Sequence, residues 1–159
     1  MKIKIGLGYD IHKLQTGRKL YLGGIELDFP KGLSGHSDGD CLIHAVIDAL
    51  LGAMGEGDIG QMFPDTDRRY KDIRSTELLK QVVEMCRGQG WQIVHIDSVI
   101  IAERPKISSS IGRMKQALCP LLHINEKDLG IKAKTNEGMG LIGEGEAIAA
   151  FAQVLIQSR

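Results

Sequence analysis

The chain has 159 residues, and its 20 lysines and arginines balance 20 aspartates and glutamates, so its formal net charge is zero. A single domain of this length, residues 1–159, can bury a core without disulfides or a structural metal. The balanced charge argues against partners such as nucleic acid or an anionic membrane, which both require a basic excess. No apolar run reaches the roughly 18–20 residues of a membrane span, and the first residues lack the apolar region of a signal peptide.

The apolar pattern predicts strands and helices that are interleaved along one continuous domain. The predicted strands cover residues 2–9, 19–22, 25–27, 91–103 (as one or two segments) and 131–135. The predicted helices cover residues 40–54, 75–87 and 109–122. Residues 147–156 are apolar throughout and fit either a helix or a buried strand. We therefore expect an α/β or α+β fold, with a mixed sheet and helices on one face.

The cysteines Cys41, Cys86 and Cys119 lie far apart and form no C-x-x-C pair. An odd number of isolated cysteines indicates reduced, mostly buried thiols, so we expect a cytoplasmic protein. For these thiols, and for His95 and His123, we expect roles in the core or on the surface rather than in a functional site.

Asp10, His12 and His44 form the first candidate site. Asp10 and His12 end the first predicted strand, where residues two apart project to the same face. The return of the chain into the next helix can bring His44 over that strand end, and one carboxylate with two imidazoles is a zinc-type ligand set. Asp48 lies four residues after His44, where it can accept a hydrogen bond from a histidine's second nitrogen. Alternatively, Asp10 caps a turn, His12 faces solvent and His44 is an ordinary helix residue.

The segment 33–40 places His36 and Ser37 in a glycine-flanked loop before the same helix. Backbone amides at a helix N-terminus favour phosphate, and a histidine there can donate to it. A capping loop with a surface histidine is the alternative, and the local pattern alone slightly favours it.

Three later segments carry weaker signals. Residues 57–67 form a polar, tightly turned stretch that could contact hydroxyl groups or be a plain turn. Residues 102–107 contain a proline-fixed turn that could offer backbone groups to a base ring. Lys134, Thr135 and Glu137 gather a cation, a hydroxyl and a carboxylate at a strand end, a set that suits a phosphate with its magnesium. A solvated strand end is the alternative for these three.

Taken together, the segments resemble the 2-C-methyl-D-erythritol 2,4-cyclodiphosphate synthases, and the agreement runs from Gly6 to Ala149. The motifs that carry the resemblance are G-Y-D-I-H at 8–12, G-H-S-D-G-D at 35–40 with H-A-V-I-D-A-L-L-G-A at 44–53, G-D-I-G-x-x-F-P-D-T-D at 57–67, A-x-x-P-K at 102–106 and T-N-E-G-M-G at 135–140. Their order and spacing also match the family.

The resemblance implies two metal sites. One zinc ion per subunit would be held by Asp10, His12 and His44, and Glu137 would bind a second cation, Mg²⁺ or Mn²⁺, together with the substrate's diphosphate. Because the family forms homotrimers with a site at each subunit boundary, no single chain would hold a complete site.

The resemblance also assigns roles in catalysis and substrate binding. His36 and Thr135 would stabilise the transition state by holding phosphate oxygens. The residues implied for the methylerythritol part are Asp58, Gly60, Phe63, Pro64, Asp65, Thr66 and Asp67. The residues implied for the cytidine pocket are Ala102, Lys106, Ile107, Ala133 and Lys134. The remaining substrate contacts are Asp10, His12, His36, Ser37, Thr135 and Glu137.

The implied reaction converts 4-diphosphocytidyl-2-C-methyl-D-erythritol 2-phosphate into a cyclic diphosphate in the non-mevalonate isoprenoid pathway. The 2-phosphate would attack the β-phosphorus and release CMP. The resemblance also implies weak contact with other pathway enzymes. A zinc-dependent phosphoester hydrolase, with Asp48 as its base, is a second reading of the residues. A non-catalytic trimeric scaffold for pathway partners is a third.

The chain departs from the family's pattern at two positions. Glu144 stands where many members carry an arginine associated with a cavity on the trimer axis for an isoprenoid diphosphate, so we expect that binding to be weak or absent. Lys134 stands where a threonine is common and adds positive charge beside the diphosphate.

Overall fold

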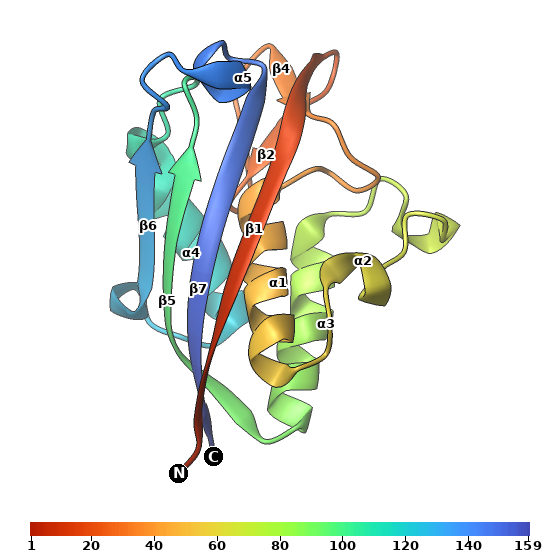
Figure 1. Cartoon of the computed structure of the whole chain (residues 1–159), viewed down its shortest axis with the longest axis vertical. Helices are drawn as coiled ribbons and strands as arrows, with labels where there is room; N and C mark the ends of the chain where they lie inside the picture. The colour runs from red at the N-terminus through yellow and green to blue at the C-terminus, as the bar shows by residue number, and fades with distance from the viewer.

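A five-stranded mixed sheet with helices against one face forms the computed structural model, which describes residues 1–159 (Figure 1). The sheet strands in spatial order are β4 (Lys31–Leu33), β1 (Ile3–Thr16), β7 (Ala147–Ser158), β5 (Trp91–Ile101) and β6 (Leu129–Lys134). Only β5 and β6 run parallel, and the other neighbours are antiparallel. A separate hairpin joins β2 (Leu20–Leu22) to β3 (Ile25–Leu27).

The helices differ greatly in length. They are α1 (Cys41–Met54), α2 (Ile59–Met62), α3 (Ser75–Gly88), α4 (Ile111–Leu122) and α5 (Gly140–Gly143). Short 3₁₀ turns cover Arg68–Tyr70, Ser108–Ser110 and Glu126–Asp128. None of the helices combines the length and the apolar character that crossing a membrane requires.

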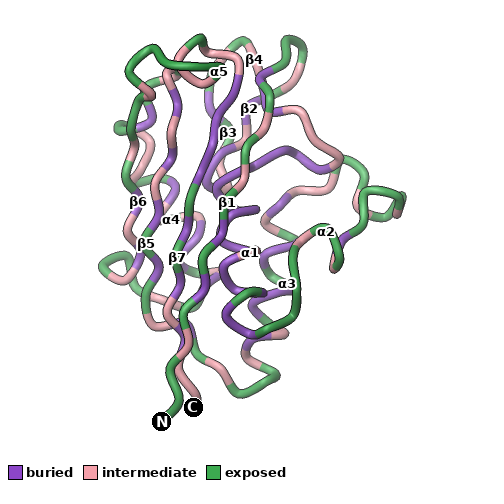
Figure 2. The backbone as a smooth tube through the Cα atoms, viewed as in Figure 1, coloured by how far each residue is buried: buried purple, intermediate pink, exposed green.

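Helix α1 is the centre of the core, because it lies between the sheet and α3. Every residue of α1 except Asp48 and Gly52 is buried, and Figure 2 shows this burial along most of the helix. Strand β1 faces α1 with its even-numbered positions, so its residues alternate between buried and exposed. Asp10 and His12 therefore point into the same layer as α1.

The sequence prediction of a mixed sheet with helices on one face is confirmed, as are the three long helices and the hairpin. The ambiguous tail is a strand, β7, which lies between β1 and β5 and is buried by both the sheet and α1. The predicted end of the first strand is wrong: β1 continues to Thr16, so Asp10 and His12 lie in its interior. Residues 10–13 of the extension pair with β7, and residues 14–16 pair with β4, a strand too short to give an alternating pattern.

The three cysteines are free and buried, as predicted. Burial raises the pKa of the Cys41 thiol well above its ordinary value, which disfavours the reactive thiolate. The cysteines therefore behave as core residues.

Candidate functional site

Three ligand-type atoms converge between β1 and α1. Oδ2 of Asp10 lies 2.8 Å from Nε2 of His12 and 3.0 Å from Nδ1 of His44, and the two ring nitrogens are 3.1 Å apart. The first two side chains share one face of β1, and the third comes from the first turn of α1. The structure therefore brings together the three residues singled out as metal ligands.

The donor set fits a zinc ion. Zinc binds carboxylate oxygen and imidazole nitrogen at about 2.0–2.2 Å, so donors of a tetrahedral site lie roughly 3.3 Å apart. The observed separations, 2.8–3.1 Å, need to open only slightly. Three protein ligands are the number that catalytic zinc sites have, in which water or substrate would supply the fourth.

Each imidazole is oriented through its other nitrogen. Nδ1 of His12 donates to the carbonyl oxygen of Ser34 at 2.6 Å, which leaves Nε2 facing Asp10. Nε2 of His44 lies 2.8 Å from the Ser75 hydroxyl and 3.1 Å from the Ser37 hydroxyl. Such outer contacts fix the ring and the tautomer of metal-binding histidines.

Asp48, which the sequence predicted as a partner of these rings, does not hydrogen-bond either of them. Its Oδ1 accepts a hydrogen bond from the amide of Ile59 at 2.8 Å, at the start of α2, so the prediction that it bonds a ligand histidine is wrong. Asp48 lies on the same face of α1 as His44, as the sequence spacing predicted. It is one helical turn further along, where it meets the amide of Ile59 instead of the imidazole rings. The actual partners, Ser34 and Ser75, had no signal in the sequence, because one acts through its carbonyl and the other begins a helix 31 residues after His44.

The charges of the site are coupled. Burial raises the pKa of Asp10, but hydrogen bonds and charges from His12 and His44 outweigh it and hold that pKa far below its ordinary value. Burial lowers the pKa of His12, but the hydrogen bond and charge of Asp10 outweigh this effect and raise its pKa above 6.5. The metal-free site therefore retains a carboxylate next to a readily protonated imidazole.

A cavity of about 270 Å³ adjoins the three ligand atoms. Its lining residues are Asp10, His12, His36, Ser37, His44, Ile59, Gly60, Phe63, Asp65, Tyr70 and Leu78. Of the residues expected near the methylerythritol part, those outside this lining are Asp58, Pro64, Thr66 and Asp67. A larger open hollow of about 630 Å³ beside Arg18 and Arg113 gathers no comparable ligand set.

His36 is fixed at the edge of this cavity. Its Nε2 donates to the carbonyl oxygen of Asp67 at 3.1 Å, and its own carbonyl accepts from the Asp72 amide at 2.8 Å. The helix-terminus argument for phosphate binding does not hold, because the buried Asp40 carboxylate already accepts from the Ile43 amide at the start of α1. Any phosphate contact here belongs to the loop side chains.

A second cavity, of about 170 Å³, lies where β5 and β6 end. Its lining residues are Ala102, Glu103, Pro105, Lys106, Ile107, Ser108, Ala133, Lys134 and Thr135. All five residues expected at the cytidine are among them, as is Thr135. Glu137 lies outside the lining and accepts a hydrogen bond from Oγ1 of Thr135 at 3.1 Å.

The two cavities lie on the same level of the sheet but far apart. Ile11 pairs with Ala149, which pairs with Ile101, which in turn pairs with Lys134. Three strand spacings of about 4.8 Å therefore separate the two sides, about 14 Å in total. One chain does not join the three-ligand group to the Thr135–Glu137 segment.

Comparisons with known proteins agree with this arrangement. The model of the YgbB family matches residues 3–157. The chain belongs to the YgbB family. A 2-C-methyl-D-erythritol 2,4-cyclodiphosphate synthase from Caldicellulosiruptor bescii is 52% identical over 96% of this chain and 98% of its own. A Plasmodium falciparum IspF in complex with CDP superposes with a TM-score of 0.87 at 34% identity, over 99% of this chain and 97% of its own.

A bifunctional IspDF from Campylobacter jejuni is also similar, with a TM-score of 0.95 and 37% identity over 99% of this chain. This chain spans 43% of that protein. The resemblance of the sequence motifs to this family is thus confirmed. Of the two departures from the family pattern, Lys134 lines the second cavity and Glu144 is exposed at the end of α5.

Proposed function

We propose that the chain is a 2-C-methyl-D-erythritol 2,4-cyclodiphosphate synthase. An oxygen of the substrate's 2-phosphate attacks the β-phosphorus of the cytidine diphosphate group, a new P–O bond closes the ring, and CMP leaves with the electrons of the broken P–O bond. The observation that carries the proposal is the convergence of Asp10, His12 and His44 beside a cavity, in a chain similar throughout to synthases of this name.

The protein's main task in this reaction is to fold a highly charged substrate, since phosphoryl transfer requires the attacking and leaving oxygens to lie in line. Asp10, His12 and His44 would hold zinc and Glu137 would hold Mg²⁺ or Mn²⁺, and the bound ions would act as Lewis acids that neutralise phosphate oxygens. His36 and Thr135 donate to phosphate oxygens, and Lys134 adds a positive charge. Phe63 adds an apolar side chain to the lining of the cavity.

The complete site requires a second copy of the chain, and we propose a homotrimer. The sheet face opposite α1 is apolar yet uncovered: Ile3, Ile5 and Leu7 are 55%, 62% and 70% exposed. Tyr9 and Phe151 stack on the same face, with ring centroids 4.7 Å apart. An apolar patch of this extent marks a protein interface. Association through it also allows the three-ligand cavity of one subunit to meet the cytidine cavity of its neighbour.

Alternatives to this function are less well supported. A zinc hydrolase needs a base beside the attacking water, and Asp48 is held by the Ile59 amide and does not line the cavity. A scaffold has no use for three convergent ligand atoms. Weak contact with other pathway enzymes is compatible with the synthase, and the bifunctional relative supports it.

The proposal is tested by ³¹P NMR of the purified protein with 4-diphosphocytidyl-2-C-methyl-D-erythritol 2-phosphate and Mg²⁺, with and without a zinc chelator. We expect CMP and a cyclic diphosphate, and we expect both to disappear on chelation. Linear phosphate products would instead identify a hydrolase. A zinc-loaded trimer that produces neither would favour the scaffold.

A further inference from the structure

We propose that Asp38 and Ser75 are positioning residues that fix the tautomer of His44, so that its Nδ1 lone pair faces the metal. The inference deepens the zinc site proposed above and rests on it. Ser75 contacts His44 only at Nε2, the ring nitrogen that faces away from the other two ligands, and Asp38 reaches His44 only through Ser75. Neither residue appears among the candidate site residues derived from the sequence.

Asp38 is a buried carboxylate surrounded by hydrogen-bond donors. Its Oδ1 accepts from the Ser75 hydroxyl at 2.5 Å and from the Asp40 amide at 3.1 Å. Its Oδ2 accepts from the Ser75 amide at 3.0 Å and from Nε of Arg74 at 3.1 Å. All four contacts require an acceptor, and only a carboxylate offers acceptors on both oxygens.

The direction of the bond to His44 follows from this arrangement. A serine hydroxyl has one proton, and the Ser75 hydroxyl gives it to Asp38. Toward Nε2 of His44, 2.8 Å away, the Ser75 oxygen can therefore only accept. The ring must therefore carry a proton on Nε2, and Nδ1, which faces Asp10 and His12, is the nitrogen whose lone pair can bind the metal.

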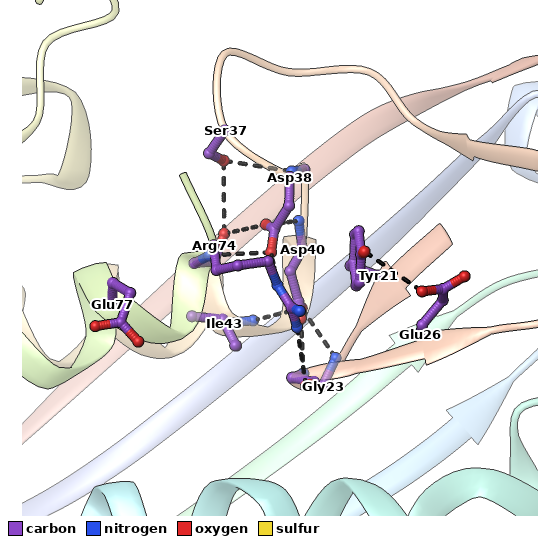
Figure 3. A network of polar contacts seen from close by, with 12 residues as sticks. Tyr21, Gly23, Glu26, Ser37, Asp38, Asp40, Ile43, Arg74 and Glu77 are labelled. Carbon is purple, nitrogen blue, oxygen red and sulfur yellow. Dashed lines mark hydrogen bonds and ion pairs between the residues drawn. The ribbon is translucent and has the colours of Figure 1, made fainter. Parts of the chain in front are cut away.

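The carboxylate itself cannot move easily. Figure 3 shows Arg74 between Asp38 and the β2–β3 hairpin. Arg74 also donates to the Gly24 carbonyl at 3.1 Å and stacks over the Tyr21 ring, 4.0 Å from its centroid. The chain of contacts from Arg74 through Asp38 and Ser75 to His44 is thus anchored at a second element of the fold.

The decisive variant is Asp38→Asn, because it keeps the shape and changes the hydrogen-bonding direction. An amide accepts with its oxygen but donates with its nitrogen, so it cannot satisfy four donors. With the amide nitrogen facing Ser75, the hydroxyl turns and donates to Nε2 of His44, which moves the ring proton to Nδ1 and blocks the zinc ligand atom. In Ser75→Ala the ring keeps only the Ser37 hydroxyl, 3.1 Å away.

The experiment measures zinc affinity by chelator competition and the His44 tautomer by ¹⁵N NMR of the metal-free protein. We expect wild type to carry the proton on Nε2, Asp38→Asn to carry it on Nδ1, and both variants to bind zinc roughly 10–100-fold more weakly. Ser98→Ala is the matched control: it also removes a buried hydroxyl, which donates to the Gly130 carbonyl at 2.7 Å, but far from the ligands. Its zinc affinity should equal that of wild type.

Circular dichroism checks that each variant folds. If Asp38→Asn does not fold, the zinc affinity of Ser75→Ala tests the inference instead. Variants that fold, retain the Nε2 proton and bind zinc within about twofold of wild type would overturn the inference while leaving the zinc site intact. Failure of wild type itself to bind zinc would reject the proposed metal site and this inference with it.

Discussion

Gly8 of β1 lies against the backbone of Ala45 in α1, so closely that a Cβ atom at position 8 would fall inside 3.0 Å of the Ala45 carbonyl oxygen. Gly6 has the same relation to Ala49, one helical turn along. The two glycines let α1 approach the strand more closely than any side chain would permit. This approach places His44 within hydrogen-bond distance of Asp10, 34 residues earlier in the chain.

Gly8→Ala should therefore disrupt both stability and the ligand group. The added methyl group cannot be relieved by a flexible side chain, because the atoms it meets are backbone, and overpacking of this kind costs about 3 kcal/mol or more. We expect a large loss in urea unfolding free energy together with weaker zinc binding. Gly52→Ala is the control, since nothing lies within 4 Å of that position and alanine favours the helix. Equal stability of Gly8→Ala and wild type would contradict the role of the close approach.

Asp40 joins the hairpin to the start of α1, and its loss should destabilise the fold. Its fully buried carboxylate accepts from the amides of Gly23, Gly24 and Ile43 at 3.0, 2.7 and 3.1 Å. Asp40→Ala leaves these buried donors without partners, which costs about 3 kcal/mol or more in total. Urea unfolding measures the change. The substitution Asp28→Ala, at an exposed carboxylate near the same hairpin, should change the free energy by less than about 0.5 kcal/mol.

The sequence predicted the parts of the fold that local chemistry determines. The glycine pair at 23–24 specified the hairpin, and both residues have positive φ, 63° and 79°. Asp40 was a cap-type residue at a helix start and caps α1. The strand nature of 147–156 was open because a continuous apolar run fits a strand and a buried helix equally. In the structure the run is a strand with one buried face, and Phe151 on its other face is exposed. Only the pairing of β7 with β1 and β5 decides between them.

The sequence predicted the three ligand residues of the candidate site but not the hydrogen bonds that orient them. Asp10 and His12 are two apart on one strand, so their common face could be derived. The hydrogen bonds of Ser75 and the Ser34 carbonyl depend on where distant segments meet, which no spacing in the sequence reports. The separation of His12 from Thr135 likewise follows from strand order, with β7 and β5 lying between β1 and β6.

Removal of a zinc ligand should abolish metal binding without unfolding the chain. In His44→Ala or Asp10→Ala, two ligand atoms remain, too few for a catalytic zinc site. We expect less than stoichiometric zinc by elemental analysis, no turnover in the ³¹P assay, and an unchanged trimer by light scattering. His123→Asn is the matched control, because His123 is exposed and its φ of 54° suits asparagine. A zinc-free variant turning over at the wild-type rate would refute the metal's role.

Zinc binding should release a proton from His12 below the raised pKa of that residue. Burial lowers the pKa of His12, but Asp10 outweighs it and raises that pKa above 6.5, so in the metal-free protein Nε2 is protonated at pH values below this raised pKa. Zinc needs this lone pair, so its affinity should weaken as the pH falls through the raised pKa. The unfolding free energy of the metal-free protein should change with pH in the opposite direction to the zinc affinity. The stabilising contribution of His12 is complete below pH 6.5 and is lost as the pH rises through the raised pKa.

Calorimetry in two buffers of different ionisation enthalpy counts the protons that zinc releases. We expect up to about one proton per zinc below the raised pKa of His12 and a decreasing number above it. Urea unfolding of the chelator-treated, metal-free protein at several pH values measures the predicted change in its unfolding free energy. Proton release that does not change between pH 5.5 and 8.5 would contradict this assignment.

Glu144 should prevent an isoprenoid diphosphate from binding on the trimer axis. In the proposed trimer three copies of this exposed carboxylate surround the axis, and like charges repel a diphosphate. Titration of wild type with geranyl or farnesyl diphosphate should show no micromolar binding, whereas Glu144→Arg should gain it. Glu126→Arg changes the net charge equally at an exposed position in the 3₁₀ turn before β6 and should gain nothing. Tight binding by wild type would show that the axis recognises the ligand through its apolar chain, because the carboxylates could only oppose the diphosphate.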